Sequence, residues 1–451
     1  MTAQRQLHLN VNVLATGRHN AAWRHPSVSK SVSDIGHFIE IAQTAERGTF
    51  DAIFFADHQA LDESAAYRPW HSLDPAILIA AISQATTHIG LVATSSTTVD
   101  QPYHVARKVA TLDHVSHGRV AWNFVTSQQD SIAQNFGYER LPLHADRYRR
   151  ANEFVDVVVK LWDSWDDEAV VADTQTGQYV DFARVRPIEH RGEFFSVRGA
   201  LNLPRPPQGR PVLIHAGDSG DSRAIGARFA DGIFTVQRTY EEARVFYEDL
   251  KSRARGFGRR DGGPLILPGL YPVVAATEAE ALARKAEFDA LLDTADELAK
   301  LAARYAYPAA KLDLDKPFPD DILSNVGTAA TNRGFLENLV RESRRENLTV
   351  RQVLGRNPLG GHRLIVGGPE QIADEIQHWF ENHAADGFNL NFDAYPSGLA
   401  LFVDHVVPVL RRRGLFRTSY TGTTLRDHLG LERPANHIRA GGADGLLAAA
   451  N

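Results

Sequence analysis

The sequence of 451 residues contains no cysteine, a single methionine and no long apolar segment. The absence of cysteine excludes disulfide bonds, thiolate metal sites and a cysteine nucleophile. The longest apolar runs, such as residues 76–82, are far too short to cross a bilayer. Residues 1–17 lack the basic start and continuous apolar core of a signal peptide. We therefore expect a cytoplasmic protein with no membrane partner.

Several motifs that carry common chemistries are also missing. The chain has no HExxH pair, no Walker phosphate-binding loop and no G-x-S-x-G nucleophile elbow. The first apparent strand, residues 7–14, lacks the His-x-His of metal-dependent hydrolase barrels, and the turn that follows it lacks the glycines of a dinucleotide-binding fold. We expect no metal site. A net charge of −6 argues against nucleic acid or an anionic membrane as a partner.

Short apolar runs alternate with helical patterns along the chain, which favours a parallel α/β fold. Eight strand–helix units predict a (β/α)8 TIM barrel, and a doubly wound open sheet is the alternative. The expected strands are residues 7–14, 51–55, 89–93, 120–125, 212–215, 232–236, 270–275 and 388–392. The expected helices are residues 34–47, 76–84, 102–115, 146–162, 219–230, a stretch after 277, and 369–382.

Two polar excursions and a tail account for the length beyond an ordinary barrel. The first, residues 163–211, contains a predicted hairpin over 179–197, and the second covers 304–362. We expect residues 1–413 to form one domain with these insertions. Residues 414–451 would form an extension that packs on the barrel or on a partner subunit, with flexible last residues.

The segment from Ile89 to Ser127 is the strongest indication of a binding site. Two apolar runs, joined by a helical pattern that begins at Pro102, each break into small polar residues. In a parallel sheet both strands end at the same edge, where α/β proteins bind their ligands. The candidates there are Thr94, Ser95, Asn123 and Ser127. Alternatively, these hydroxyl side chains only begin the loops that follow the strands.

Three further strand ends and helix starts carry candidate residues. Asp57 and His58 follow the second strand, where a carboxylate beside an imidazole suits proton transfer or simply caps a turn. Gly217, Ser219 and Gly220 lead into a helix whose N-terminus could hold a phosphate, although Ser219 could equally be an ordinary N-cap. His144 and Tyr148, four residues apart, fit one helical face that could contact a phosphate or a ribityl chain.

At these residues the chain resembles the bacterial-luciferase-like flavin monooxygenases, specifically the group of nitrilotriacetate monooxygenase component A and dibenzothiophene-sulfone monooxygenase. The resemblance runs from Leu7 to about Leu431. It is carried by the blocks AAWRHP (residues 21–26), FDAIFFADH (50–58), the segment 89–127, the block 185–220, LPGLYPVVAAT (267–277), ADGFNLNF (385–392) and the block 406–431.

The resemblance implies a barrel that takes reduced FMN from a separate NAD(P)H-dependent flavin reductase and reacts it with O2. Asp57 would then hold the isoalloxazine region, with Ser95 or Thr94 beneath the ring and Asn123 and Ser127 beside it. His144 and Tyr148 would reach the ribityl-phosphate, and Ser219 with Gly220 would bind the phosphate. One departure stands out, because the family more often reads Q-A-G-(small)-S where this chain has His215 to Ser219. Homodimers or homotetramers are expected.

The expected reaction is oxygenation of a small organic compound, in the manner of xenobiotic-degrading relatives, at a carbon next to nitrogen or sulfur with C–N or C–S cleavage. His19, Trp23 and His25 follow the first strand and are the candidates for substrate contact, with the catalytic residue left unknown. Residues 304–362 would cover the barrel mouth as a lid, or serve as a surface or subunit-contact insertion. The alternatives are a deazaflavin (F420)-dependent oxidoreductase and a non-catalytic flavin-binding barrel.

Overall fold

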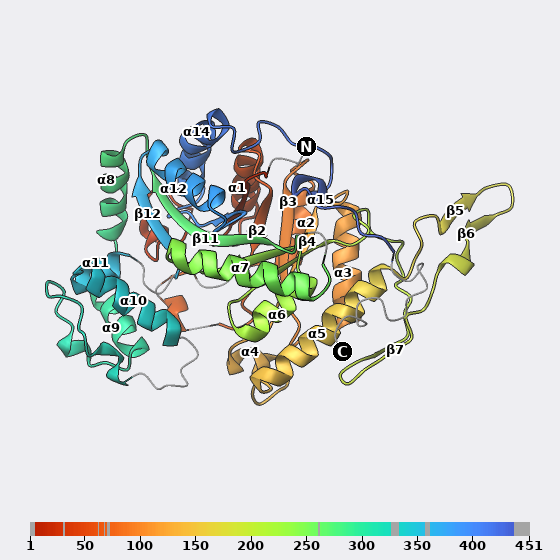
Figure 1. Cartoon of the computed structure of the whole chain (residues 1–451), viewed down its shortest axis with the longest axis horizontal. Helices are drawn as coiled ribbons and strands as arrows, with labels where there is room; N and C mark the ends of the chain where they lie inside the picture. Colours follow the sequence, from red (N-terminus) through yellow and green to blue (C-terminus); the bar gives the residue numbers. More distant parts are fainter. Residues whose placement is uncertain are drawn as a thin grey trace.

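The computed structural model shows a closed parallel barrel at the centre of the molecule (Figure 1). It describes residues 5–29, 32–61, 63–66, 68–69, 73–259, 262–325, 333–356 and 361–436. The barrel strands are β1 (His8–Asn12), β2 (Ala52–Phe55), β3 (Gly90–Ser96), β4 (Val120–Val125), β9 (Val212–Ala216), β10 (Gly232–Thr235), β11 (Leu265–Val274) and β13 (Gly387–Leu390). Because β1 pairs with β13 and β10 pairs with β11, the ring is closed and the predicted (β/α)8 barrel is confirmed. The open sheet is excluded.

The helices between these strands pack on the outside of the barrel. They are α1 (Ile35–Arg47), α2 (Pro75–Ser83), α3 (Pro102–Val115), α5 (His144–Trp162), α6 (Gly220–Phe229), α7 (Tyr240–Gly256), α8 (Glu278–Asp289) and α12 (Pro369–Glu381). The sequence reading omitted α7, although Ala243, Phe246, Leu250 and Ala254 form a buried stripe at helical spacing. The many charged residues of α7 obscured this apolar stripe in the sequence.

Strand side chains alternate between the barrel interior and the helix layer, as the pleat requires. Leu9 and Val11 of β1 pack in the outer core, whereas Asn10 and Asn12 occupy the other face. Near its base the barrel is filled by apolar side chains of β2, β3, β4 and β9, namely Ala52, Phe54, Val92, Ala121, Val212 and Ile214. Polar inward positions are therefore concentrated toward the carboxyl ends of the strands.

The seventh barrel strand is longer than expected and has an additional neighbour. β11 begins at Leu265, five residues before the predicted start, and its second half pairs with β12 (Arg363–Gly367). The sequence reading predicted no strand between the second excursion, which ends at 362, and the helix that begins at 369; β12 lies there. The internal prolines of β11 concealed its true length, since proline lacks the N–H that a ladder uses.

The first excursion forms two hairpins where one was expected over residues 179–197. β5 (Val170–Asp173) pairs with β6 (Gln178–Val180), and β7 (His190–Arg191) pairs with β8 (Ser196–Val197). The turn of the first hairpin is built by Asp173, whose carboxylate accepts the backbone N–H groups of Gln175 and Thr176. Gly177 completes this turn with a φ of 73°. Both hairpins extend to the same side of the barrel (Figure 1).

The second excursion folds around an apolar core of its own, at the opposite side of the barrel from the hairpins (Figure 1). We call residues 294–355 the helical unit. Its helices are α9 (Thr294–Arg304), α10 (Arg333–Arg345) and α11 (Val350–Gly355). It starts ten residues before the expected boundary at 304. Asn20, in the loop after β1, donates to Glu297 of α9 at 3.0 Å, so the unit contacts the carboxyl-end face of the barrel.

The C-terminal segment closes the opposite, amino-terminal end of the barrel. Leu425 and Leu429, at the short helix α15 (Leu425–His428), join the apolar cluster of the barrel interior. The Leu425 N–H donates to the carbonyl of Gly118, just before β4. Leu425 also touches Gly90 so closely that a Cβ there would collide with it. The helix therefore acts as an apolar plug below the strands.

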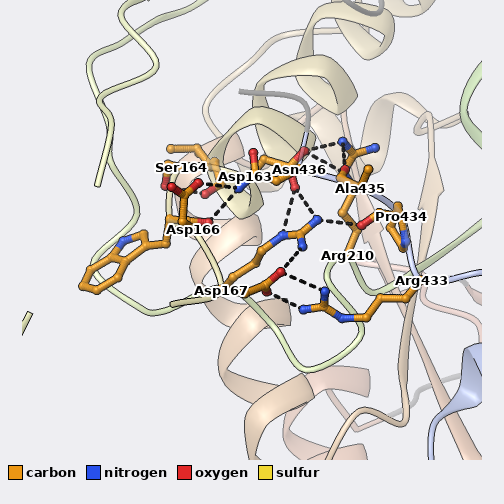
Figure 2. Close-up of polar contacts among 12 residues, drawn as sticks. Asp163, Ser164, Asp166, Asp167, Arg210, Arg433, Pro434, Ala435 and Asn436 are labelled. Atoms are coloured by element: carbon orange, nitrogen blue, oxygen red, sulfur yellow. Dashed lines mark hydrogen bonds and ion pairs between the residues drawn. The ribbon is translucent and has the colours of Figure 1, made fainter. Parts of the chain in front are cut away.

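Ion pairs hold the residues that follow this plug (Figure 2). Asp163, at the end of α5, pairs with Arg205 and Arg210, and Asp167 pairs with Arg433 at 2.5 Å. Asn436 donates to the carbonyl of Trp165 at 2.8 Å. The expected flexibility of the last residues concerns 437–451, which lie outside the described residues. Among the residues that are described, no helix is long and apolar enough to cross a membrane.

The plug predicts a large effect of Leu425→Ala on stability. Removing this buried side chain would leave a cavity at the base of the barrel and lower the free energy of unfolding by about 3 kcal/mol. Urea denaturation followed by circular dichroism measures this loss. The matched control is Ile77→Ala, because Ile77 is 72% exposed on α2 and should change stability by less than about 0.5 kcal/mol. Equal small effects in both variants would contradict the role of the plug.

Candidate functional site

The carboxyl ends of β2, β3 and β4 are joined by a buried polar contact. Thr94 donates its hydroxyl hydrogen to the carbonyl of Phe55 at 2.7 Å, and the Asn123 side-chain N–H donates to the Thr94 hydroxyl at 2.9 Å. Asn123 Oδ1 is buried and accepts no hydrogen bond from any described residue. The mouth of the barrel therefore offers an acceptor to a ligand that carries an N–H group.

A second polar contact lies between these strand ends and α5. The hydroxyls of Ser96 and Ser127 lie 2.7 Å apart, and the carbonyl of Ser127 accepts from Arg147 at 2.8 Å. Ser96 was not among the predicted residues. Ser95, which was, is half-buried and lies on the opposite face of β3 from Thr94 and Ser96, because strand side chains alternate. Ser127 lies at the mouth beside β3.

The first turns of α5 and α6 meet through His144. Its Nδ1 lies 3.2 Å from Asp221 Oδ2 in α6, and its ring centroid lies 4.8 Å from that of Tyr148. Asp221 directly follows Gly220, so His144 and Tyr148 lie near the start of α6. His144 and Asp221 are both half-exposed, which leaves this junction open to solvent.

The turn before α6 has the geometry of a helix cap. Ser219 is the N-cap, and its hydroxyl accepts the Ser222 N–H at 3.2 Å. Gly217 adopts a φ of 153°, and a Cβ there would collide with the Ser222 hydroxyl. Gly220 has open space around it. Burial raises the pKa of Asp218, while its ion pair with Arg223 at 2.7 Å opposes that shift.

His215 lies beneath the turn and faces away from the barrel mouth. Its Nδ1 is 2.7 Å from the Phe124 carbonyl, its Nε2 is 2.9 Å from the Ser222 hydroxyl, and its ring stacks on Phe124. Burial lowers the pKa of His215 to about 4, so the ring is neutral near pH 7. It then donates to the carbonyl and accepts from Ser222, which supports the turn from below.

Asp57 follows β2, beside the end of β3. Burial is the main cause that raises the pKa of Asp57 to about 6, with a further contribution from the charge of Asp74. Asp100 adds to this effect, and Lys108 opposes it. A carboxyl group that changes charge near neutral pH at a barrel mouth is a candidate for ligand binding.

The three candidates for substrate contact lie around α8. His19 Nε2 is 3.2 Å from Asp289, His25 Nε2 is 2.8 Å from Glu287, and both rings pack against Phe288. These two histidines thus hold the β1 loop on α8. Trp23 lines a separate pocket of about 310 Å³ that also includes Arg68 and Lys300.

Sequence reasoning missed a group of residues on the β1, β11 and β13 side of the mouth. His362 precedes β12 and stacks on Phe234, and Arg18 follows Gly17 in the β1 loop. Tyr271 lies on β11, where burial raises the pKa of its hydroxyl well above the usual value. The glycine before Arg18 was the only signal of this group in the sequence. His362 gave no signal, because it reaches the barrel through tertiary packing alone.

The described residues contain no group of three or more histidine, aspartate or glutamate side chains that could hold a metal ion.

Comparison with known proteins connects this site to an enzyme family. A family described as luciferase-like monooxygenase matches residues 11–386. The chain is 42% identical to N-acetyl-S-(2-succino)cysteine monooxygenase of Bacillus subtilis (strain 168), over 96% of this chain and 98% of that protein. It is also 42% identical to nitrilotriacetate monooxygenase component A of Aminobacter aminovorans, over 97% of this chain and 99% of that protein.

Solved structures give the same result. DmoA of Hyphomicrobium sulfonivorans superposes with a TM-score of 0.85 at 32% identity, over 98% of this chain and 97% of that chain. EDTA monooxygenase of Chelativorans sp. BNC1 superposes with a TM-score of 0.80 at 35% identity, over 95% of this chain and 99% of that chain. An F420-dependent secondary alcohol dehydrogenase reaches a TM-score of 0.57 at 15% identity over 90% of this chain and 99% of that chain, which shows a shared fold alone.

The raised pKa of Asp57 predicts a pH-dependent stability difference between the wild type and Asp57→Asn. Because the pKa in the folded state, about 6, is above the unfolded value, the folded protein binds the proton more tightly. Wild-type stability relative to the variant should therefore fall as pH rises from about 4 to about 6 and stay constant above that. Thermal unfolding of both proteins from pH 4 to 7.5 measures this difference. If the unfolding temperatures of the two proteins change in parallel with pH, the raised pKa of Asp57 is contradicted.

Proposed function

Because this chain belongs to the luciferase-like monooxygenase family, we propose that it uses reduced FMN and O2 to oxygenate a small organic substrate. Family membership makes it a flavin-dependent monooxygenase. The proposal adds the identity of the flavin, its binding residues, its source and the type of reaction. The observation that carries it is the set of contacts that joins the ends of β2, β3 and β4 to the first turns of α5 and α6.

In this proposal the isoalloxazine ring lies over the ends of β2, β3 and β4. Asp57 and Asn123 face its polar edge, with Thr94 beneath it and Ser127 beside it; Ser95, the other candidate for the position beneath the ring, lies on the opposite face of β3. The partnerless carbonyl oxygen of Asn123 fits a flavin, since the reduced ring carries N–H groups that a buried acceptor requires. Its flat ring also suits a mouth whose floor is formed by strand ends.

The phosphate would lie at the first turn of α6. Ser219 and Gly220 are exposed there, and the first N–H groups of a ten-residue helix favour an anion. Two nearby carboxylates would oppose it, but each has a cationic or polar partner: Arg223 for Asp218 and His144 for Asp221. His144 and Tyr148 would donate to the ribityl chain and phosphate.

The chain's own residues would hold the flavin and keep water away from it. When bound, reduced FMN supplies the electrons with which one atom of O2 enters the substrate and the other becomes water. The helical unit lies against the loop after β1 and is proposed to cover the mouth. Asp57, with its raised pKa of about 6, can change its hydrogen bonding to the ring near neutral pH.

The reduced flavin would come from a separate NAD(P)H:flavin reductase. One relative is named as component A of nitrilotriacetate monooxygenase, which fits a system of two components. An exposed junction at α6 suits a cofactor that enters and leaves by diffusion. We further propose a homodimer or homotetramer and a cytoplasmic location. The extension from residue 414 on is proposed to pack on the barrel, as its plug does, or on a partner subunit.

The proposed reaction is oxygenation at a carbon next to nitrogen or sulfur, followed by C–N or C–S cleavage. The names of two relatives indicate an amine and a thioether as their substrates. No observation at this site favours an F420-dependent oxidoreductase. A non-catalytic barrel would bind FMN without turnover, so it is separated from the proposal by the experiment below.

The FMN site predicts weaker binding in Tyr148→Phe and in Ser219→Ala. Each variant loses one hydrogen bond to a charged or strongly polar group, and the affinity should fall by about 1 kcal/mol or more. Quenching of FMN fluorescence measures the dissociation constant. The control is Tyr179→Phe, since Tyr179 is 69% exposed on the distant β5–β6 hairpin. Unchanged affinity in both site variants would place the phosphate elsewhere.

Turnover is tested with FMN, a flavin reductase and NADH under air, with candidate amines and thioethers. We expect substrate-dependent product that carries one oxygen atom from labelled O2, detected by mass spectrometry. FMN binding without any oxygenated product across the panel would favour the non-catalytic barrel. No FMN binding at all would overturn the proposed function.

A further inference from the structure

The loops that follow β3 and β4 hold each other at the barrel mouth. The Ser127 N–H donates to the Thr98 hydroxyl at 3.1 Å, and the N–H and hydroxyl of Thr97 both donate to the carbonyl of Val125, at 2.8 and 3.0 Å. The Ser96 hydroxyl, which contacts that of Ser127, also accepts the Thr98 N–H at 3.1 Å. These serine and threonine side chains are buried. The two loops therefore form one buried polar unit on the side of the mouth that is proposed to hold the flavin.

Arg150, in the second turn of α5, holds this unit from outside. Its guanidinium donates to the carbonyl of Thr97 and, at 3.2 Å, to the carbonyl of Asp100. Asp100 is bound to Ser96 in both directions, because its carboxylate accepts the Ser96 N–H at 3.1 Å and its own N–H donates to the Ser96 carbonyl at 3.2 Å. We call residues 97–100 the β3 loop. Arg150 thus fixes both ends of the β3 loop and, through Asp100, the end of β3 itself.

The aromatic side of the Arg150 guanidinium is provided by α5 and by the β7–β8 hairpin. The guanidinium carbon lies 4.7 Å from the centre of the Phe195 ring and 5.7 Å from that of Phe154. The two rings meet edge to face at 5.6 Å between centroids, and both are buried. An aromatic face attracts a guanidinium group without competing for its N–H groups. Phe195 can therefore orient Arg150 and leave its donors to the carbonyls of the β3 loop.

Glu153, one turn after Arg150, fixes the hairpin that carries Phe195. Its carboxylate accepts the N–H groups of Phe194 at 2.9 Å and Phe195 at 2.8 Å, and it lies 3.0 Å from Nε2 of His190. Gly192 permits this approach, since a Cβ there would collide with the carboxylate. Burial alone would raise the pKa of Glu153, but these hydrogen bonds lower it. The hairpin is therefore attached to α5 independently of Arg150.

We propose that Arg150 is a positioning residue of the flavin site, and that the β7–β8 hairpin orients it through Phe195. This inference rests on the proposed function, because it concerns the same flavin site. Arg150 acts through the β3 loop, which sets the place of the Ser96 and Ser127 hydroxyls beside the ring. The hairpin belongs to the first excursion, outside the barrel, so an insertion distant from the mouth in sequence helps to shape the mouth.

The contacts separate this role from that of a plain staple between the excursion and the barrel. Loss of the Arg150 guanidinium would leave the carbonyl of Thr97, a fully buried residue, without this donor. The β3 loop has no sheet ladder of its own and would open locally. The hairpin would stay in place, because Glu153 and the packing of Phe154 on Phe195 hold it. A plain staple would show the reverse pattern, with a loosened hairpin and an unchanged mouth.

The test combines hydrogen–deuterium exchange of the free chain with FMN binding, well below the unfolding temperature. In Arg150→Gln we expect exchange at least about tenfold faster in peptides from the β3 loop and residues 125–129, with unchanged exchange in residues 188–198. The FMN dissociation constant, measured by fluorescence quenching, should rise about fivefold or more. Arg150→Lys retains the charge and a donor and should recover part of both properties.

Phe195→Leu keeps an apolar side chain but removes the aromatic face, so it should change both properties in the same direction by a smaller factor. It also tests the inference if Arg150→Gln does not fold. The matched control is Arg149→Gln, since Arg149 is an exposed neighbour on α5 that pairs with Glu193 of the same hairpin at 2.5 Å. This variant should leave the exchange of the β3 loop and the FMN affinity unchanged.

Three results would overturn the inference: wild-type exchange of the β3 loop in Arg150→Gln and Phe195→Leu, faster exchange confined to the hairpin, or equal effects of the Arg149 and Arg150 variants. Absence of FMN binding to the wild-type chain, with exchange of the β3 loop still dependent on Arg150, would instead refute the proposed function.

Discussion

The pairing of the first barrel strand with the last is the constraint on which the rest of this structure depends. β1 and β13 are joined in parallel from His8 and Gly387 onward, where a side chain at position 387 would collide with the His8 carbonyl. Asp51, at the start of β2, secures the same end of the ring. It accepts the Leu9 N–H at 2.7 Å and pairs with His8 and Arg417. Burial alone would raise the pKa of Asp51, but the charges of Arg417 and His8 lower it below the usual value. The C-terminal segment thus neutralises the carboxylate that ties β1 to β2.

Closure of the ring brings every strand's carboxyl end to one mouth and divides that mouth into two chemically different sides. The ends of β2, β3 and β4 carry hydroxyl and amide groups, which hydrogen-bond one another and leave Asn123 Oδ1 without a donor. On the β1 and β11 side, burial and then the charges of Arg18 and Arg238 lower the pKa of His362. A flat, polar cofactor suits the first side. The apolar base below, sealed by Leu425 and Leu429, keeps polar ligands at the mouth.

Much of this framework is local and could be predicted from the sequence. The strand–helix alternation, the polar ends of β3 and β4, and the Ser219 turn all depend on short-range patterns, and the structure shows each of them. The helix after β4 was also visible, because a charged first turn precedes a long apolar stripe, although its start was predicted at residue 146 and lies at His144. What these residues bind was suggested by resemblance to a family, and the family was confirmed by comparison.

The remaining features depend on contacts between distant segments, which no local pattern records. Ser96 rather than Ser95 contacts Ser127 because β3 extends to Ser96, one residue beyond Ser95, and the alternation of strand side chains decides which hydroxyl faces β4. His19 and His25 were read as substrate contacts, but α8 supplies an acid to each of them. His362 reaches the barrel only because β12 adds to β11 beside Gly269. The two hairpins of the first excursion were merged into one because the Asp173 turn lies within a uniformly polar stretch.

A crystal structure of the chain with FMN tests this account of the mouth most directly. The account predicts the isoalloxazine ring over the ends of β2, β3 and β4, with the phosphate at Ser219 and Gly220. An isoalloxazine ring against His362, or a phosphate bound away from the first turn of α6, would contradict it.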